Sequence, residues 1–107
     1  MSLLAQAATG TLDYSPPALE AFASGAAVTF GLNKDHFLAT IYCESGFRAS
    51  VLGDDGQSLG VAQIDLKYHP DITRAEAMEP YWSILWMAYE WQHNKADMWS
   101  CWRNLFS

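Results

Sequence analysis

The sequence predicts a single, mainly α-helical domain with about five helices and a small extended loop or hairpin that follows the second helix. Helix-start residues precede several segments in which apolar residues recur at helical spacing. A Gly- and Asp-rich stretch interrupts this pattern near the middle of the chain, and residues 81–92 are almost continuously apolar or aromatic. The sequence contains no internal repeat and no low-complexity tract.

The first helix is predicted to begin with Ser15 as its N-cap and Pro16 at its first helical position, and to end at Gly31. Its apolar residues at helical spacing are Leu19, Phe22, Ala23, Ala26 and Phe30. Gly25 in the middle predicts either a close contact with another helix or a frayed segment, because glycine costs about 1 kcal/mol relative to alanine inside a helix.

The second helix is predicted to start after Asn33, its N-cap, and to end near Ser45, just before Gly46. Because the connection to the first helix is very short, the two should form a helical hairpin. The side chains expected to point from this helix into the core are Phe37, Leu38, Ile41 and Tyr42.

Residues 50–65 are predicted to form a turn between short extended pieces. Thr73 and Glu76 then form a capping box that starts a short helix ending before Pro80. Pro80 should open the longest helix, which we expect to be buried on most sides and to form the spine of the core. Asp97 can cap a last helix that holds Trp99, Cys101, Trp102 and Leu105.

The composition indicates one ordered domain over residues 15–107, preceded by a flexible segment, residues 1–14, that is a leader, an expression remnant or a frayed terminus. The first residues lack a basic region and a long apolar run, so they give no clear signal peptide. The net charge of −6, without a basic cluster, argues against nucleic acid as a partner. No stretch is apolar for long enough to predict a membrane span.

Two cysteines, Cys43 and Cys101, lie far apart in the sequence. An even number of cysteines permits a disulfide without requiring one. The sequence is therefore compatible with a bridge and with two buried free thiols.

Glu44 is the residue around which the predicted site is organised. It follows Phe37 and Ile41 at i+7 and i+3, which places its carboxylate on the apolar face of the second helix. It also lies in the last turn of that helix, where the macrodipole disfavours a negative charge. Burial and the dipole both predict a raised pKa, which is what a general acid requires near neutral pH.

Two other kinds of chemistry find little support. Residues 56–60 fit the Gly-x-Ser-x-Gly pattern of serine hydrolases, but the remaining chain is mostly helical and too short for the sheet which that mechanism needs. We expect neither a metal nor another cofactor. A calcium loop at residues 54–56 would lack its Glu, and His36, His69 and His93 share no ligand spacing.

A family resemblance rests on two segments. Glu44-Ser45-Gly46-Phe47 and, after a Gly/Asp turn, Ser58-Leu59-Gly60-Val61-Ala62-Gln63 match the Glu-Ser-x-Phe and Ser-x-Gly-x-x-Gln pattern. The chain therefore resembles the superfamily of lytic transglycosylases and goose-type lysozymes. The resemblance implies a lysozyme-like α+β fold, and peptidoglycan glycan strands as the partner. It also implies an exported or cell-wall-facing location, whether periplasmic, extracellular or virion-associated.

In this resemblance Glu44 is the single catalytic acid/base, while Ser45 fixes the helix end and Phe47 anchors the following loop. The implied substrate-binding residues are Ser58, Gly60 and Gln63, and Tyr89 is implied as a hydrogen-bond partner of Glu44. Tyr68 is a further groove candidate because it lies outside any apolar stripe. Ser83 stands where relatives often have Asn, so the far wall of the groove departs from the pattern.

The implied reaction is cleavage of the β-1,4 bond between N-acetylmuramic acid and N-acetylglucosamine, with a 1,6-anhydro product. One alternative is a hydrolytic lysozyme that uses a second carboxylate. The candidates for that carboxylate are Asp54, Asp55 and Asp65. Another alternative is a non-catalytic module for cell-wall binding or assembly.

Overall fold

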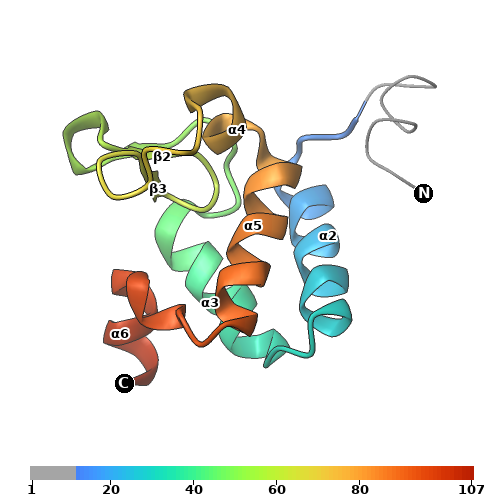
Figure 1. Cartoon of the computed structure of the whole chain (residues 1–107). Coiled ribbons are helices and arrows are strands. Elements are labelled where there is room, and N and C mark those ends of the chain that lie inside the picture. Colours follow the sequence, from blue (N-terminus) through green and yellow to red (C-terminus); the bar gives the residue numbers. More distant parts are fainter. Residues whose placement is uncertain (1–11) are drawn as a thin grey trace.

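The computed structural model describes residues 12–107 and is mainly helical, with five α-helices and a small antiparallel sheet in this part of the chain. Helices α2 (Pro16–Thr29), α3 (Lys34–Ser45) and α5 (Pro80–Gln92) form the body of the domain (Figure 1). The sheet and the short helix α4 (Arg74–Met78) lie at one end of α5, and α6 (Ser100–Phe106) lies near its other end. The predicted fold class is therefore confirmed.

The predicted caps of the first helices are present. The Ser15 side chain accepts a hydrogen bond from the N–H of Ala18, and Asn33 Oδ1 accepts one from His36 at 3.1 Å. Gly46 ends α3 in the left-handed conformation, with a φ of 64°. These are local signals, since each cap satisfies a backbone group only a few residues away.

The extended region forms three two-residue strands in the order β1-β2-β3, all antiparallel. Strand β1 (Leu52–Gly53) pairs with β2 (Ser58–Leu59) across a 3₁₀ turn, and β2 pairs with β3 (Ile64–Asp65). Leu59 pairs with Ile64 and both are buried, so the sheet packs one end of the core.

The core lies between α2, α3, α5 and the sheet. Side chains that α5 buries include Ile84, Met87 and Trp91, and Trp91 packs edge-on against Phe37 with ring centroids 5.1 Å apart. The helix is buried on most sides, as predicted, although Trp82 and Trp86 are only half-buried. The prediction that it is the longest helix is wrong, because it has 13 residues and α2 has 14.

Two further expectations are corrected by the structure. Tyr42 is 69% exposed, because it lies beside rather than on the Phe37–Ile41 face of α3. Asp97 does not cap the last helix. It lies in a 3₁₀ turn, Ala96–Met98, and α6 begins only at Ser100, with no side-chain cap at Trp99.

The cysteines form a disulfide between Cys43 on α3 and Cys101 on α6, 58 residues apart in the sequence. A bridge that closes a loop of this size restricts the unfolded chain and is expected to raise the free energy of unfolding by about 4 kcal/mol. The usual range for a disulfide is about 2–4 kcal/mol. The bridge therefore holds a short terminal helix to the body of the domain.

Gly60 and Gly25 provide a matched test of the packing. A Cβ at Gly60 would lie 2.7 Å from the carbonyl oxygen of Ala77 in α4, and Gly60 has a φ of +73°. We expect Gly60→Ala to lower the free energy of unfolding by about 1–3 kcal/mol. Gly25 has no atom within 4 Å of the Cβ position, so Gly25→Ala should raise it by about 0.5–1 kcal/mol.

Urea denaturation of the two variants measures both effects. An unchanged free energy for Gly60→Ala would show that the loop can move away from α4 without cost.

Candidate functional site

Glu44 lies in the last turn of α3, at a helix end that is tied to the sheet region. The neighbouring Ser45 is buried, and its hydroxyl donates to the carbonyl oxygens of Ile41 at 3.2 Å and Val61 at 2.7 Å. Phe47, two residues further, is buried in the core. The end of the helix is thereby fixed relative to the segment between β2 and β3.

The carboxylate of Glu44 meets the first turn of α6. Its Oε2 accepts a hydrogen bond from the backbone N–H of Cys101 at 3.1 Å. Cys101 is also the disulfide partner of Cys43, the residue just before Glu44. The covalent bridge and the hydrogen bond therefore join the same two turns of helix.

The pKa of Glu44 is raised above its ordinary value, as predicted, and burial of the half-buried carboxyl is the largest cause. The hydrogen bond from Cys101 opposes this rise, the negative charge of Asp54 adds to it, and Arg103 and the hydroxyl of Ser100 lower the pKa again. The pKa of this carboxyl therefore reflects both the chain segment around Asp54 and α6.

Arg48, one turn after Glu44 in the sequence, forms no ion pair with the Glu44 carboxylate. Its Nε donates to the carbonyl oxygen of Ser45 at 3.1 Å. Within residues 12–107 the carboxylate of Glu44 forms no salt bridge, and the nearby cation that lowers its pKa is Arg103. Arg48 therefore does not neutralise the carboxylate of Glu44.

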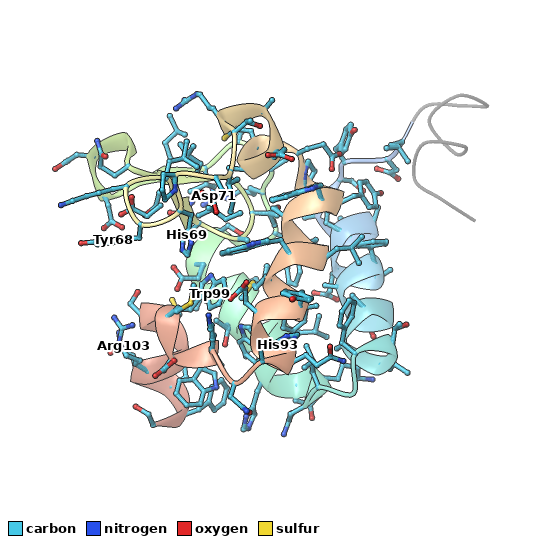
Figure 2. The ribbon with its side chains drawn as sticks, viewed as in Figure 1. Tyr68, His69, Asp71, His93, Trp99 and Arg103 are labelled. Carbon is cyan, nitrogen blue, oxygen red and sulfur yellow. A yellow bond between two sulfur atoms is a disulfide. The ribbon has the colours of Figure 1, made fainter. Side chains whose placement is uncertain are left out.

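Glu44 lines a cleft of about 240 Å³ between the sheet region and α6. One wall comes from the segment between β1 and Tyr68, and the other comes from residues 98–103. Figure 2 shows Tyr68 on the first wall, and Trp99 and Arg103 on the second. The residues that line this cleft are Glu44, Asp54, Ser58, Gln63, Asp65, Tyr68, Met98, Trp99, Ser100 and Arg103.

Two of the three candidate second carboxylates, Asp54 and Asp65, line the same cleft as Glu44, whereas Asp55 does not. Ser58 is buried, and its hydroxyl donates to Asp54 Oδ2 at 2.6 Å. Ser58 therefore orients an acidic side chain toward the cleft, a role that the sequence did not suggest.

Gln63 lines the cleft, but both of its N–H donors are used inside the loop. Its Nε2 donates to the carbonyl oxygens of Val51 at 3.1 Å and Gly60 at 2.8 Å. Gln63 also has a φ of +51°, which is uncommon for a residue with a side chain.

Gly60 does not line the cleft. Its missing side chain would face α4, so the structure assigns it a packing role and gives no support to substrate contact.

The cleft continues past Trp99 into an aromatic groove. A second cavity of about 340 Å³ shares Gln63, Asp65, Tyr68, Met98 and Trp99 with it and adds His69 and Trp86. A third, of about 310 Å³, extends from Tyr68, His69 and Trp86 to Trp82. The groove thus runs from Glu44 along one side of α5, with Tyr68 in all three cavities.

The aromatic rings of this groove order one another. The Trp82 and Trp86 rings are nearly parallel, with centroids 6.5 Å apart, and Trp99 packs edge-on against Trp86 at 5.8 Å. The indole of Trp99 donates to the carbonyl oxygen of Ala62 at 2.8 Å. The sequence did not single out these tryptophans, because half-buried groove residues and core residues share the same spacing on a helix.

The prediction that Tyr89 hydrogen-bonds Glu44 is not met. Tyr89 lies on α5 with its ring 4.3 Å from that of His93, and it lines none of the three cavities of the groove. The hydrogen bond that Glu44 accepts comes instead from α6. Ser83 is buried, and its hydroxyl donates to the carbonyl oxygen of Pro80, so it forms no part of a groove wall.

No group of three or more potential metal-ligating side chains gathers among residues 12–107. In the same part of the chain, no helix is both long and apolar enough to cross a membrane. Comparisons of the chain with protein families, with curated proteins and with solved structures found no match.

The pKa of Glu44 gives a direct test of the site. We expect ¹³C NMR titration to place it above the ordinary value, and Asp54→Asn to lower it by removing a nearby negative charge. Asp55→Asn is the matched control and should leave it unchanged.

Since the folded protein binds this proton more tightly than the unfolded chain, the contribution of Glu44 to stability should fall as the pH rises through the two pKa values. An ordinary pKa for Glu44, or equal effects of the two variants, would contradict this description of the site.

Proposed function

We propose that the protein is a lytic transglycosylase that cleaves the β-1,4 bond between N-acetylmuramic acid and N-acetylglucosamine in peptidoglycan. The observation that carries the proposal is a half-buried carboxyl, Glu44, with a raised pKa in a cleft that continues into an aromatic groove. The two segments on which the family resemblance rests also meet at this cleft, through Glu44 on one side and Ser58 and Gln63 on the other.

In the proposed reaction, protonated Glu44 donates its proton to the glycosidic oxygen as the bond from that oxygen to C1 breaks. The resulting carboxylate then removes the proton of the C6 hydroxyl of the same N-acetylmuramic acid residue. The C6 oxygen attacks C1, which forms the 1,6-anhydro ring and returns the proton to Glu44. One carboxyl suffices for both steps, and no cofactor is required.

Hydrolysis is a second candidate, and Asp54 is the observation that favours it. A carboxylate oriented by Ser58 in the same cleft is able to activate a water or to stabilise an oxocarbenium ion. The products then carry an ordinary reducing end instead of an anhydro ring.

The groove suits a neutral, hydroxyl-rich polymer. The faces of aromatic rings carry partial negative charge and attract the polarised C–H groups of a sugar ring. Tyr68, 70% exposed, lies where the cavities meet. The disulfide supports an exported or cell-wall-facing location, because such bonds persist chiefly in oxidising compartments.

Digestion of purified sacculi, followed by mass spectrometry of the released muropeptides, tests the function. We expect anhydro-muropeptides from the wild-type protein and at least a hundredfold slower release from Glu44→Gln, since the amide cannot donate a proton as an acid does. Glu20→Gln, on the exposed surface of α2, is the control and should cleave normally.

Reducing-end products would establish the hydrolase instead. Binding to sacculi without any release would establish the non-catalytic cell-wall module.

Tyr68 and Tyr89 form a matched pair for the groove, since both are exposed tyrosines but only Tyr68 lines it. In the Glu44→Gln background, Tyr68→Ala should weaken the binding of soluble glycan fragments by about five- to tenfold, which is about 1–1.4 kcal/mol. Tyr89→Ala should bind as the parent does. Isothermal titration calorimetry measures both affinities. Equal affinities of the two variants would show that Tyr68 does not contact the glycan.

A further inference from the structure

The disulfide lies directly beside Glu44 in both of the segments that it joins. Cys43 precedes Glu44 in the sequence, and Cys101 supplies both the second sulfur and the N–H that binds the Glu44 carboxylate. The protein thus links the last turn of α3 to the first turn of α6 covalently, directly beside its candidate catalytic acid.

Helix α6 has few other attachments. It has seven residues, of which Cys101 alone is buried, and a helix of this length is not stable by itself. Its packing within the described chain is mainly against α3 and the preceding 3₁₀ turn. The further contacts are the stacking of Phe106 on His36, with ring centroids 3.8 Å apart, and the packing of half-buried Trp102 against the core. At its start, Trp99 donates a hydrogen bond to Ala62 and packs edge-on against Trp86.

The segment that the bridge holds makes one wall of the cleft. Met98, Trp99, Ser100 and Arg103 line it, and Cys101 provides the hydrogen bond to Glu44. Burial is the largest cause of the raised pKa of Glu44, so removing this wall would change the acid as well as the shape of the cleft.

Reductants have access to the bridge from one side. Cys43 is exposed, whereas Cys101 is buried beneath it. We therefore expect an attacking thiolate to reach the bridge from the side of Cys43.

We propose that Cys43 and Cys101 are positioning residues for Glu44, and that their disulfide is a redox switch which assembles the cleft in the oxidised protein and releases α6 in the dithiol. In the switching step a dithiol reductant gives two electrons and two protons to the bridge. Both cysteines become thiols, and the reductant becomes a disulfide. The effect on cleavage rests on the proposed function, whereas the release of α6 does not.

The test compares the oxidised protein, the protein kept in dithiothreitol, and Cys43→Ser/Cys101→Ser. Hydrogen exchange should show at least a tenfold loss of protection in α6 of the reduced protein, with α2 and α5 unchanged. By ¹³C NMR the pKa of Glu44 should move toward its ordinary value. Release of muropeptides by the reduced protein should fall at least tenfold and return on reoxidation. The double variant should resemble the reduced protein, and dithiothreitol should not change its behaviour.

Equal protection of α6 and an equal pKa of Glu44 in both redox states would overturn the proposal. So would loss of protection in α2 and α5 together with α6, because the bridge would then only stabilise the whole domain. If the oxidised protein releases no muropeptides, the proposed function fails, while hydrogen exchange and the pKa still decide the switch.

Discussion

The hydrogen bond between Glu44 and the N–H of Cys101 is the contact on which the site depends. A carboxylate that is partly withdrawn from water needs a donor, and the fold supplies one from the backbone of a different helix. That helix is too short to be stable by itself, and the disulfide to Cys43 ties it to α3 next to this contact. Charge, helix position and covalent bridge are therefore one arrangement rather than three independent features.

The opposite wall is built by backbone restraints. The hydroxyl of Ser45 joins the end of α3 to the carbonyl oxygen of Val61. Gln63 donates both of its amide hydrogens to carbonyl oxygens of the loop, and Gly60 allows this loop to pack closely against α4. With this frame fixed, Ser58 can hold Asp54 at the cleft. Several residues that a sequence pattern assigns to substrate binding thus act first as supports, and the proposed function leaves substrate contact to the aromatic and charged groups beside them.

The parts of this structure that sequence predicts are those with local causes. Helix caps, the left-handed Gly46 and the placement of Glu44 at a helix end follow from residues within one or two turns of each other. Contacts across the chain have no such signal. The wall made by α6, the pairing of the two cysteines and the orientation of Tyr89 depend on how α3, α5 and α6 pack, and an apolar helix face looks the same in sequence whether it meets the core or a groove. For the same reason the tryptophans of α5 could not be assigned to the core or to a groove. Asp97 is a residue type common at N-caps, but it lies in a 3₁₀ turn that the sequence did not predict.

The balance of effects on the pKa of Glu44 is compatible with the proposed reaction, in which this residue acts first as an acid and then as a base. Burial and the charge of Asp54 hold the proton on the carboxyl, while Cys101, Ser100 and Arg103 stabilise the carboxylate after the proton has left. Burial alone would keep the carboxyl protonated before the reaction but would oppose the transfer of its proton, since a strongly raised pKa makes the ionised form costly. Donors from α6 moderate that cost. The same short helix therefore forms one wall of the cleft and limits the shift in the pKa of Glu44, and the proposed mechanism with a single carboxyl needs both.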